Sequence, residues 1–96
     1  MRTSKTVKKG VRLLNEWNCQ WPIYIDLRKL NMRSCTRCIL GQLFDDFGRG
    51  RDTLGIAVGG SRHYGLDGVS QSTQTWRKVI KACRVKLRVL RRLAKK

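Results

Sequence analysis

The sequence predicts a mainly helical protein of about three helices, the last of them long, basic and amphipathic. Two observations predict this class. The chain has only 96 residues, which limits the core to about one packed layer of helices. Apolar residues also recur at helical spacing in its N-terminal, central and C-terminal parts. We expect a single domain over 1–96, with a basic N-terminal segment at 1–12, a core at 13–80 and a basic C-terminal helical extension at 81–96.

The N-terminal helix is predicted from Val7 onwards. Val7, Val11 and Leu14 share one side at helical spacing, whereas Lys8 lies away from it. Gly10 weakens this prediction, because a glycine inside a helix costs about 1 kcal/mol relative to alanine.

A short extended segment is expected within 21–32. Trp21 and Pro22 end the preceding helix, since proline lacks the amide that a helix interior needs. The apolar residues that follow alternate along the chain, namely Ile23, Ile25 and Leu27. A turn is expected at 26–29.

The central helix is predicted from about Cys35 to Phe47, with Ser34 as its N-cap. Its apolar residues repeat at helical spacing: Ile39, Leu40, Leu43, Phe44 and Phe47. We expect 48–52 to interrupt the helix, 53–56 to add one further turn, and the Gly- and Ser-rich stretch 57–74 to form a loop.

The C-terminal segment has the most regular pattern. On a helical wheel, one side carries Trp76, Val79, Ile80, Cys83, Leu87, Leu90 and Ala94. The opposite side carries Arg77, Lys81, Arg84, Arg88, Arg91, Arg92 and Lys95, and no acidic residue follows Asp67. This pattern predicts an amphipathic helix of about 28 Å, with Ser72 or Thr73 as its cap.

The charge predicts an anionic partner. With 22 basic and 6 acidic residues the formal net charge is +16, whereas about 2 to 8 is enough to keep a small domain in solution. The partner can be nucleic acid, an acidic protein or an anionic membrane surface, and the alternative is a solvated basic face with no partner. No apolar run approaches the ~18 residues of a membrane span, and no secretory signal is visible. We therefore expect a cytoplasmic protein with reduced cysteines.

Cys35 and Cys38 form a Cys-x-x-Cys pair, for which three hypotheses stay open. They can supply two of the four ligands of a structural zinc ion, but the other candidates, Cys19, Cys83 and His63, stand alone. A redox pair lacks the expected strand and helix context. We favour the third hypothesis, in which Cys38 is a small core residue and Cys35 lies in the first turn of the central helix. No metal or cofactor is expected.

Nothing in the sequence indicates an enzyme. His63 has no catalytic partner in a recognisable setting, and the glycine-rich stretches lack the phosphate-binding patterns. The cluster of Asp45, Asp46 and Asp52 is expected to pair with Arg49 and Arg51 at the surface.

Four stretches, "WPIYIDLRKLNM", "CILGQLFDDFGRGRDTLGI", "YGLD" and "WRKVI", resemble a group of small uncharacterised proteins of actinobacteriophages and their hosts. These proteins share a Cys-Ile/Val-Leu-Gly-Gln-Leu/Val-Phe/Tyr core, a later Leu-Gly, a Gly-Phe-Asp-like turn and a late Trp followed by Ile. The matching positions are Cys38 to Phe44, Leu54 and Gly55, Gly65 to Asp67, Trp76 and Ile80.

The resemblance covers about residues 21–80 and implies no activity, but it suggests a packing or polar network role for Gln42, where the ordinary interpretation is a helix-surface residue. Asp45 stands where members more often carry glycine, and Leu66 where they carry Phe. The basic residues at both ends of the chain lie outside the shared pattern.

The predicted function is that of a small, basic, non-enzymatic nucleic-acid-binding accessory protein, and the resemblance implies a phage origin. The residues expected to contact DNA or RNA phosphates are Arg77, Lys78, Lys81, Arg84, Arg88, Arg91, Arg92 and Lys95, assisted by Lys5, Lys8, Lys9 and Arg12. The alternative is a phage effector that binds an acidic host protein and modulates its activity. A third hypothesis is a membrane-surface role for the C-terminal helix.

Overall fold

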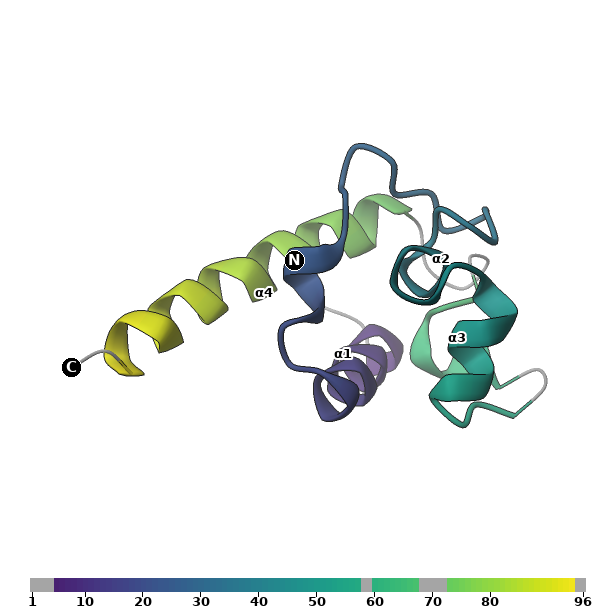
Figure 1. Cartoon of the computed structure of the whole chain (residues 1–96), viewed down its shortest axis with the longest axis horizontal. Helices are drawn as coiled ribbons and strands as arrows, with labels where there is room; N and C mark the ends of the chain where they lie inside the picture. Colours follow the sequence, from purple (N-terminus) through teal and green to yellow (C-terminus); the bar gives the residue numbers. More distant parts are fainter. Residues whose placement is uncertain (1–4, 58–59, 68–72, 95–96) are drawn as a thin grey trace.

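The computed structural model describes residues 5–57, 60–67 and 73–94. It contains the α-helices α1 (Lys5–Trp17), α2 (Ile39–Phe44), α3 (Phe47–Thr53) and α4 (Thr73–Ala94), and the 3₁₀ helices η1 (Trp21–Tyr24) and η2 (Ser61–Tyr64). No strand occurs in the described part of the chain, so the mainly helical class with a long C-terminal helix is confirmed. Figure 1 shows α1, α2 and α3 gathered at one end, with the last turns of α4 extending well beyond them.

Two tryptophans form the centre of the core. The rings of Trp21 and Trp76 meet edge to face, with centroids 6.4 Å apart and planes at 78°, an arrangement that aromatic quadrupoles favour. Trp21 Nε1 donates to Asn15 Oδ1 at 2.9 Å, and Trp76 Nε1 donates to the Gly65 carbonyl at 2.7 Å. Both indoles are fully buried without an unpaired N–H. The other buried apolar residues are Val7, Leu14, Ile25, Leu30, Met32, Cys38, Ile39, Leu40, Ile56, Leu66 and Ile80.

α1 forms as the spacing predicts, with Val7 and Leu14 fully buried. Gly10 faces the core, because a Cβ at this position would lie under 3.0 Å from the Tyr64 carbonyl oxygen and at 3.0 Å from Trp76 Cη2. The glycine that argued against a helix is therefore required by the close approach of α1 to η2, and burial of the helix offsets its low propensity.

The extended segment predicted from Trp21 is wrong over 21–24, whereas Ile25, directly after them, has extended backbone. Residues 21–24 form the 3₁₀ helix η1, with Pro22 in its first turn, where the missing amide leaves no bond unmade. The alternating apolar residues do not share one buried face, because Ile25 is buried whereas Ile23 is 43 % exposed. The turn at 26–29 is confirmed by the hydrogen bond from the Lys29 amide to the Asp26 carbonyl at 3.2 Å.

The predicted central helix starts later than Cys35. Residues 35–37 form turns, and Ser34 Oγ accepts from the Arg37 amide at 3.1 Å, so Ser34 closes a turn and is not the predicted N-cap of a helix. The N-cap of α2 is Cys38, whose Sγ accepts from the Gly41 amide at 3.2 Å. Gln42 then joins the helix to the preceding loop.

Gln42 makes three hydrogen bonds to backbone groups. Its Oε1 accepts from the Asp26 amide at 2.6 Å, and its Nε2 donates to the carbonyls of Asp26 at 3.1 Å and Arg37 at 3.0 Å. The polar network role expected for Gln42 is confirmed. Both ends of the 26–37 loop are fastened by this one side chain.

The predicted central helix is also divided at Asp45. Asp45 has φ 74°, in the left-handed region that favours glycine, and it is the position where the resembling proteins more often carry glycine. α3 then begins because Asp46 Oδ1 accepts from the Arg49 amide at 3.0 Å. Residues 48–52, predicted to interrupt the helix, lie inside α3, and 54–55 form a turn where another helical turn was expected.

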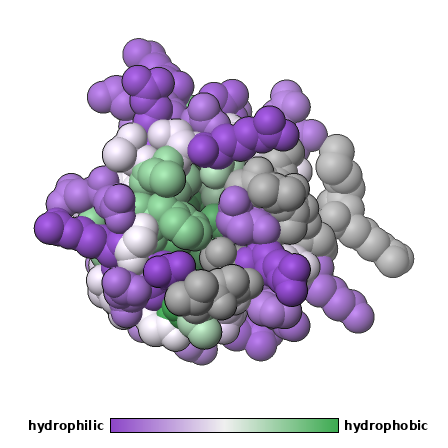
Figure 2. All heavy atoms as spheres, turned by 90° about the vertical axis from the view of Figure 1, so that its right-hand side faces the viewer, coloured by the Kyte–Doolittle hydropathy of each residue, from purple (hydrophilic) through white to green (hydrophobic). Residues whose placement is uncertain are grey.

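Gly50 allows α3 to pack directly on α2. A Cβ on Gly50 would meet Leu40 Cβ at 2.7 Å and Phe44 Cδ2 at 2.9 Å. Figure 2, which views this end of the molecule, shows apolar atoms in the centre of the face within a hydrophilic rim. The half-buried Leu43, Phe44 and Phe47 belong to these two helices.

The region 57–74 is not wholly a loop, because it contains η2. Residues 58–59 and 68–72, including the predicted cap Ser72, lie outside the described residues. Thr73, the other predicted cap, begins α4, and its Oγ1 accepts from the Met32 amide at 2.9 Å. This bond fixes the start of α4 against the 26–37 loop.

Replacing Gly10 with alanine is expected to destabilise the protein by about 3 kcal/mol, since the new methyl group collides with the Tyr64 backbone. The measurement is urea unfolding followed by circular dichroism. Lys8→Ala is the matched control, because Lys8 is exposed on the same helix. An unchanged or raised midpoint for Gly10→Ala would show that α1 does not approach η2 this closely.

Candidate nucleic-acid interface

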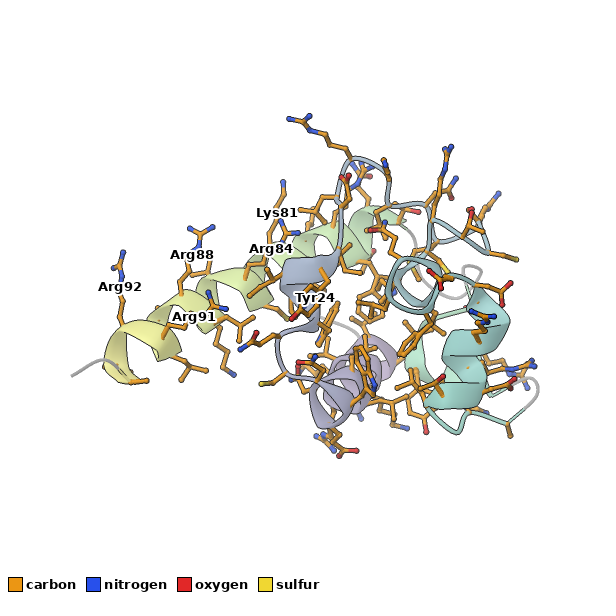
Figure 3. The ribbon with its side chains drawn as sticks, viewed as in Figure 1. Tyr24, Lys81, Arg84, Arg88, Arg91 and Arg92 are labelled. Atoms are coloured by element: carbon orange, nitrogen blue, oxygen red, sulfur yellow. The ribbon has the colours of Figure 1, made fainter. Side chains whose placement is uncertain are left out.

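The predicted basic side of α4 becomes accessible where the helix leaves the body of the protein. Ile80 is fully buried, Leu87 is half-buried, and every described residue from Arg88 to Ala94 is exposed. Figure 3 shows the side chains of Lys81, Arg88 and Arg92 extending from the same side of α4. These three side chains form a line of positive charge that we call the cationic edge.

Three arginines also surround a groove beside the cationic edge. The groove measures 340 Å³ and is lined by Arg84, Arg88, Arg91, Ile23 and Leu87. Three of its five lining residues are arginines, and the two apolar ones come from η1 and α4. Such a groove offers planar, charge-assisted donors to an anion.

Arg84 lines the groove and also makes hydrogen bonds that hold α4 to the body of the protein. Its Nε donates to the Pro22 carbonyl at 2.9 Å, and its Nη2 donates to the Ile25 carbonyl. Arg84 therefore ties α4 to the end of η1. Because those carbonyls belong to a 3₁₀ turn and its flank, the guanidinium also satisfies acceptors that the short helix leaves open.

Arg77 is half-buried in a similar way. Its Nη2 lies 3.5 Å from the Leu30 carbonyl, while its Nε is buried without a partner in the described structure. Lys78 on the same turn is exposed. The first basic residues of α4 thus differ from the later ones, since Arg77 contributes to the contact between α4 and the 26–37 loop.

The N-terminal cations form a separate group. Lys5, Lys8, Lys9 and Arg12 are all exposed on α1. Lys9 and Arg12 line a groove of 240 Å³ together with Glu16 and Tyr64, and no residue of α4 lines it. The structure does not unite these cations with those of α4 in one groove, and Lys95 lies outside the described residues.

Sequence reasoning missed two features near α4. Tyr24 of η1 is 57 % exposed and directly follows Ile23, which lines the arginine groove (Figure 3). The exposed loop residues Arg28, Lys29, Arg33 and Arg37 are also basic. The absence of any acid from residue 27 to residue 44 was the available signal for this basic loop.

The ion pairs of the described residues lie within 45–52, away from α4. Arg49 pairs with Asp45 at 3.6 Å and Arg51 with Asp52 at 3.9 Å, so the pairing predicted for Asp45 and Asp52 is confirmed. Asp46, predicted to pair in the same way, instead caps α3 by accepting from the Arg49 amide. Within the described residues, Arg88, Arg91 and Arg92 form no ion pair. Their charge is therefore available to an external anion.

The cysteines show no cluster of metal ligands. No group of three or more Cys, His, Asp or Glu residues gathers in the described part of the chain. Cys38 is a buried core residue, as predicted, and burial raises the pKa of its thiol. Cys35 is exposed, and it lies before α2 instead of in its first turn. Burial also raises the pKa of Cys83.

Comparisons with protein-family models, curated proteins and solved structures found no match to this chain. Among the described helices, none has the length and apolar content to cross a bilayer.

Replacing Arg84 with glutamine is expected to lower the free energy of unfolding by about 2 kcal/mol, because two backbone carbonyls lose a charged donor. Arg88→Gln removes the same charge one turn later and should leave stability nearly unchanged. Urea unfolding of the two variants makes the comparison. Equal unfolding midpoints would show that the hydrogen bonds from Arg84 to the Pro22 and Ile25 carbonyls do not stabilise the fold. Because Arg84 is expected to affect stability, variants that test binding should keep it.

The four thiols are expected to react with iodoacetamide in the order of their exposure. At about pH 8 the exposed Cys19 and Cys35 should react first, Cys83 more slowly and Cys38 last, because only the thiolate reacts and burial disfavours it. Mass spectrometry of timed samples gives the rates. In denaturant the differences should disappear, whereas rapid labelling of Cys38 in the native protein would contradict its place in the core.

Proposed function

We propose that this chain is a non-enzymatic nucleic-acid-binding protein that contacts phosphates through α4. The observation that carries the proposal is the cationic edge: Lys81, Arg88 and Arg92 extend from one side of a helix that projects from the body (Figure 3). Phosphate contacts of this kind supply affinity without reading the sequence of bases.

The dimensions of the projecting helix support binding to a duplex. The exposed residues from Arg88 to Ala94 rise by about 10 Å at 1.5 Å per residue. A helix of about 10–12 Å diameter matches a DNA major groove about 12 Å wide. Basic side chains on the edge of such a helix face the phosphates that border the groove.

The neighbouring arginine groove and Tyr24 support a contact with unpaired bases as a second mode. Arg91 and Arg88 line the groove, and aromatic rings beside cations stack with bases in proteins that bind single strands. One aromatic ring is a small platform, so we place the main interaction on the duplex backbone.

The test is a titration of fluorescent duplex DNA and RNA with the wild type and with Arg88→Gln/Arg92→Gln, at about 50 to 200 mM salt. The plot of log K against log salt should become shallower by about 1.8 for the variant, since each lost phosphate contact removes about 0.9. Arg49→Gln/Arg62→Gln removes the same two charges from α3 and η2 and serves as the matched control.

A slope that falls equally in both variants would show that only the net charge matters. Duplex binding that is absent at the lowest salt would reject the proposal outright. A parallel titration of single-stranded DNA with Tyr24→Ala assigns the second mode, which requires a selective loss of single-strand affinity.

A further inference from the structure

The apolar side of α4 continues past the point where the core ends. Trp76, Ile80, Cys83, Leu87, Leu90 and Ala94 follow one another at alternating intervals of four and three residues, which is the a and d pattern of a coiled-coil heptad. Trp76 and Ile80 are fully buried, but Leu90 is 52 % exposed. We call this line of six apolar residues the seam. The seam therefore begins in the core and ends at the protein surface.

A groove lies where this seam leaves the core. It measures 260 Å³ and runs between α1, η1 and α4, with Val11, Pro22, Cys83, Leu87 and Leu90 among its walls and Lys86 beside them. Most of these walls are apolar. A concave apolar groove beside an exposed apolar seam is a typical receptor for the apolar face of a helix.

One flank of the seam is uniformly basic at its e positions, whereas the g positions on the other flank carry Val79, Lys86 and Leu93. In the heptad register set by Trp76, the e positions carry Arg77, Arg84 and Arg91, and Lys86 occupies the g position nearest the groove. Charges at e and g select the partner of a helix by complementarity. Acidic residues at the facing positions of a partner helix would complement these basic residues.

We propose that this groove and seam bind an acidic amphipathic helix of another protein. A second copy of this chain is disfavoured, since its own seam carries the same arginines at the e positions and its net charge is +16. An anionic bilayer fits less well, because a planar surface cannot enter a groove between α1 and α4. The apolar side chains of a helix can fill it.

This surface is distinct from the cationic edge. Lys81 and Arg88 occupy b positions of the heptad and Arg92 an f position, on the side of α4 away from the seam. The inference is thus independent of nucleic-acid binding, and each can fail without the other.

The experiment uses a fluorescent synthetic peptide of about three heptads with Leu at a and d and Glu at e and g. Fluorescence anisotropy should show saturable binding of one peptide per full-length chain. Leu90→Ser should weaken it at least about tenfold, the change expected for losing one buried leucine. Val85→Ser is the matched control, because Val85 is 57 % exposed on α4 but does not line the groove.

Charge is tested by a second pair of variants. Lys86→Glu should weaken peptide binding more than Lys78→Glu, since Lys86 lines the groove and Lys78 lies a little over two turns earlier, away from it. Circular dichroism establishes that all four variants keep the native helix content.

Three results would overturn the proposal. The first is equal binding of a scrambled peptide with the same composition, which would show charge attraction alone. The second is equal weakening by Leu90→Ser and Val85→Ser. The third is the absence of peptide binding together with Leu90-dependent binding to vesicles containing phosphatidylglycerol, which would assign the seam to an anionic membrane.

Discussion

The edge-to-face contact between Trp21 and Trp76 holds the rest of the structure in place. Trp76 lies in the first turns of α4, and Trp21 begins η1, so their contact fixes where α4 crosses the body. Each indole N–H is bonded to a different neighbour, Asn15 on α1 and the Gly65 carbonyl after η2. A buried N–H left unpaired would cost about 1–3 kcal/mol, and so these bonds hold α1 and the η2 region to the same pair.

The position of α4 determines which of its residues are structural. Its first turns supply Trp76 and Ile80 to the core, and Arg84 then binds the carbonyls that follow η1. Beyond Arg84 the helix has little packing, yet its high density of arginine is compatible with helix formation. Arginine has a high helix propensity, and cations near the C-terminus interact favourably with the helix dipole.

The two long helices were predictable because their apolar periodicity extends over several turns. The short elements were not, because single contacts decide them. A cysteine is an unusual N-cap, so the sequence does not indicate that α2 begins after Cys38. Asp46 begins α3, although the two glycines of this helix have a low helix propensity. The packing reason for Gly10 depends on Tyr64, which lies far along the sequence. The structural role of Arg84 is likewise set by η1, and a helical wheel shows only that the residue is basic.

The sequence pattern also concealed that α4 has two chemically different exposed sides beyond the core, one basic and one apolar. A wheel drawn over the whole helix averages its buried and projecting halves, so Leu90 was grouped with Trp76 although one is half-exposed and the other fully buried. In the structure, the seam and the cationic edge lie across a helix about 10–12 Å wide. This width exceeds a Debye length of about 8 Å at physiological ionic strength. Charges on a ligand in the groove are therefore largely screened from Arg92, whereas Arg88, which lines the arginine groove together with Arg91 and Leu87, lies closer to the charges that an acidic helix would bring.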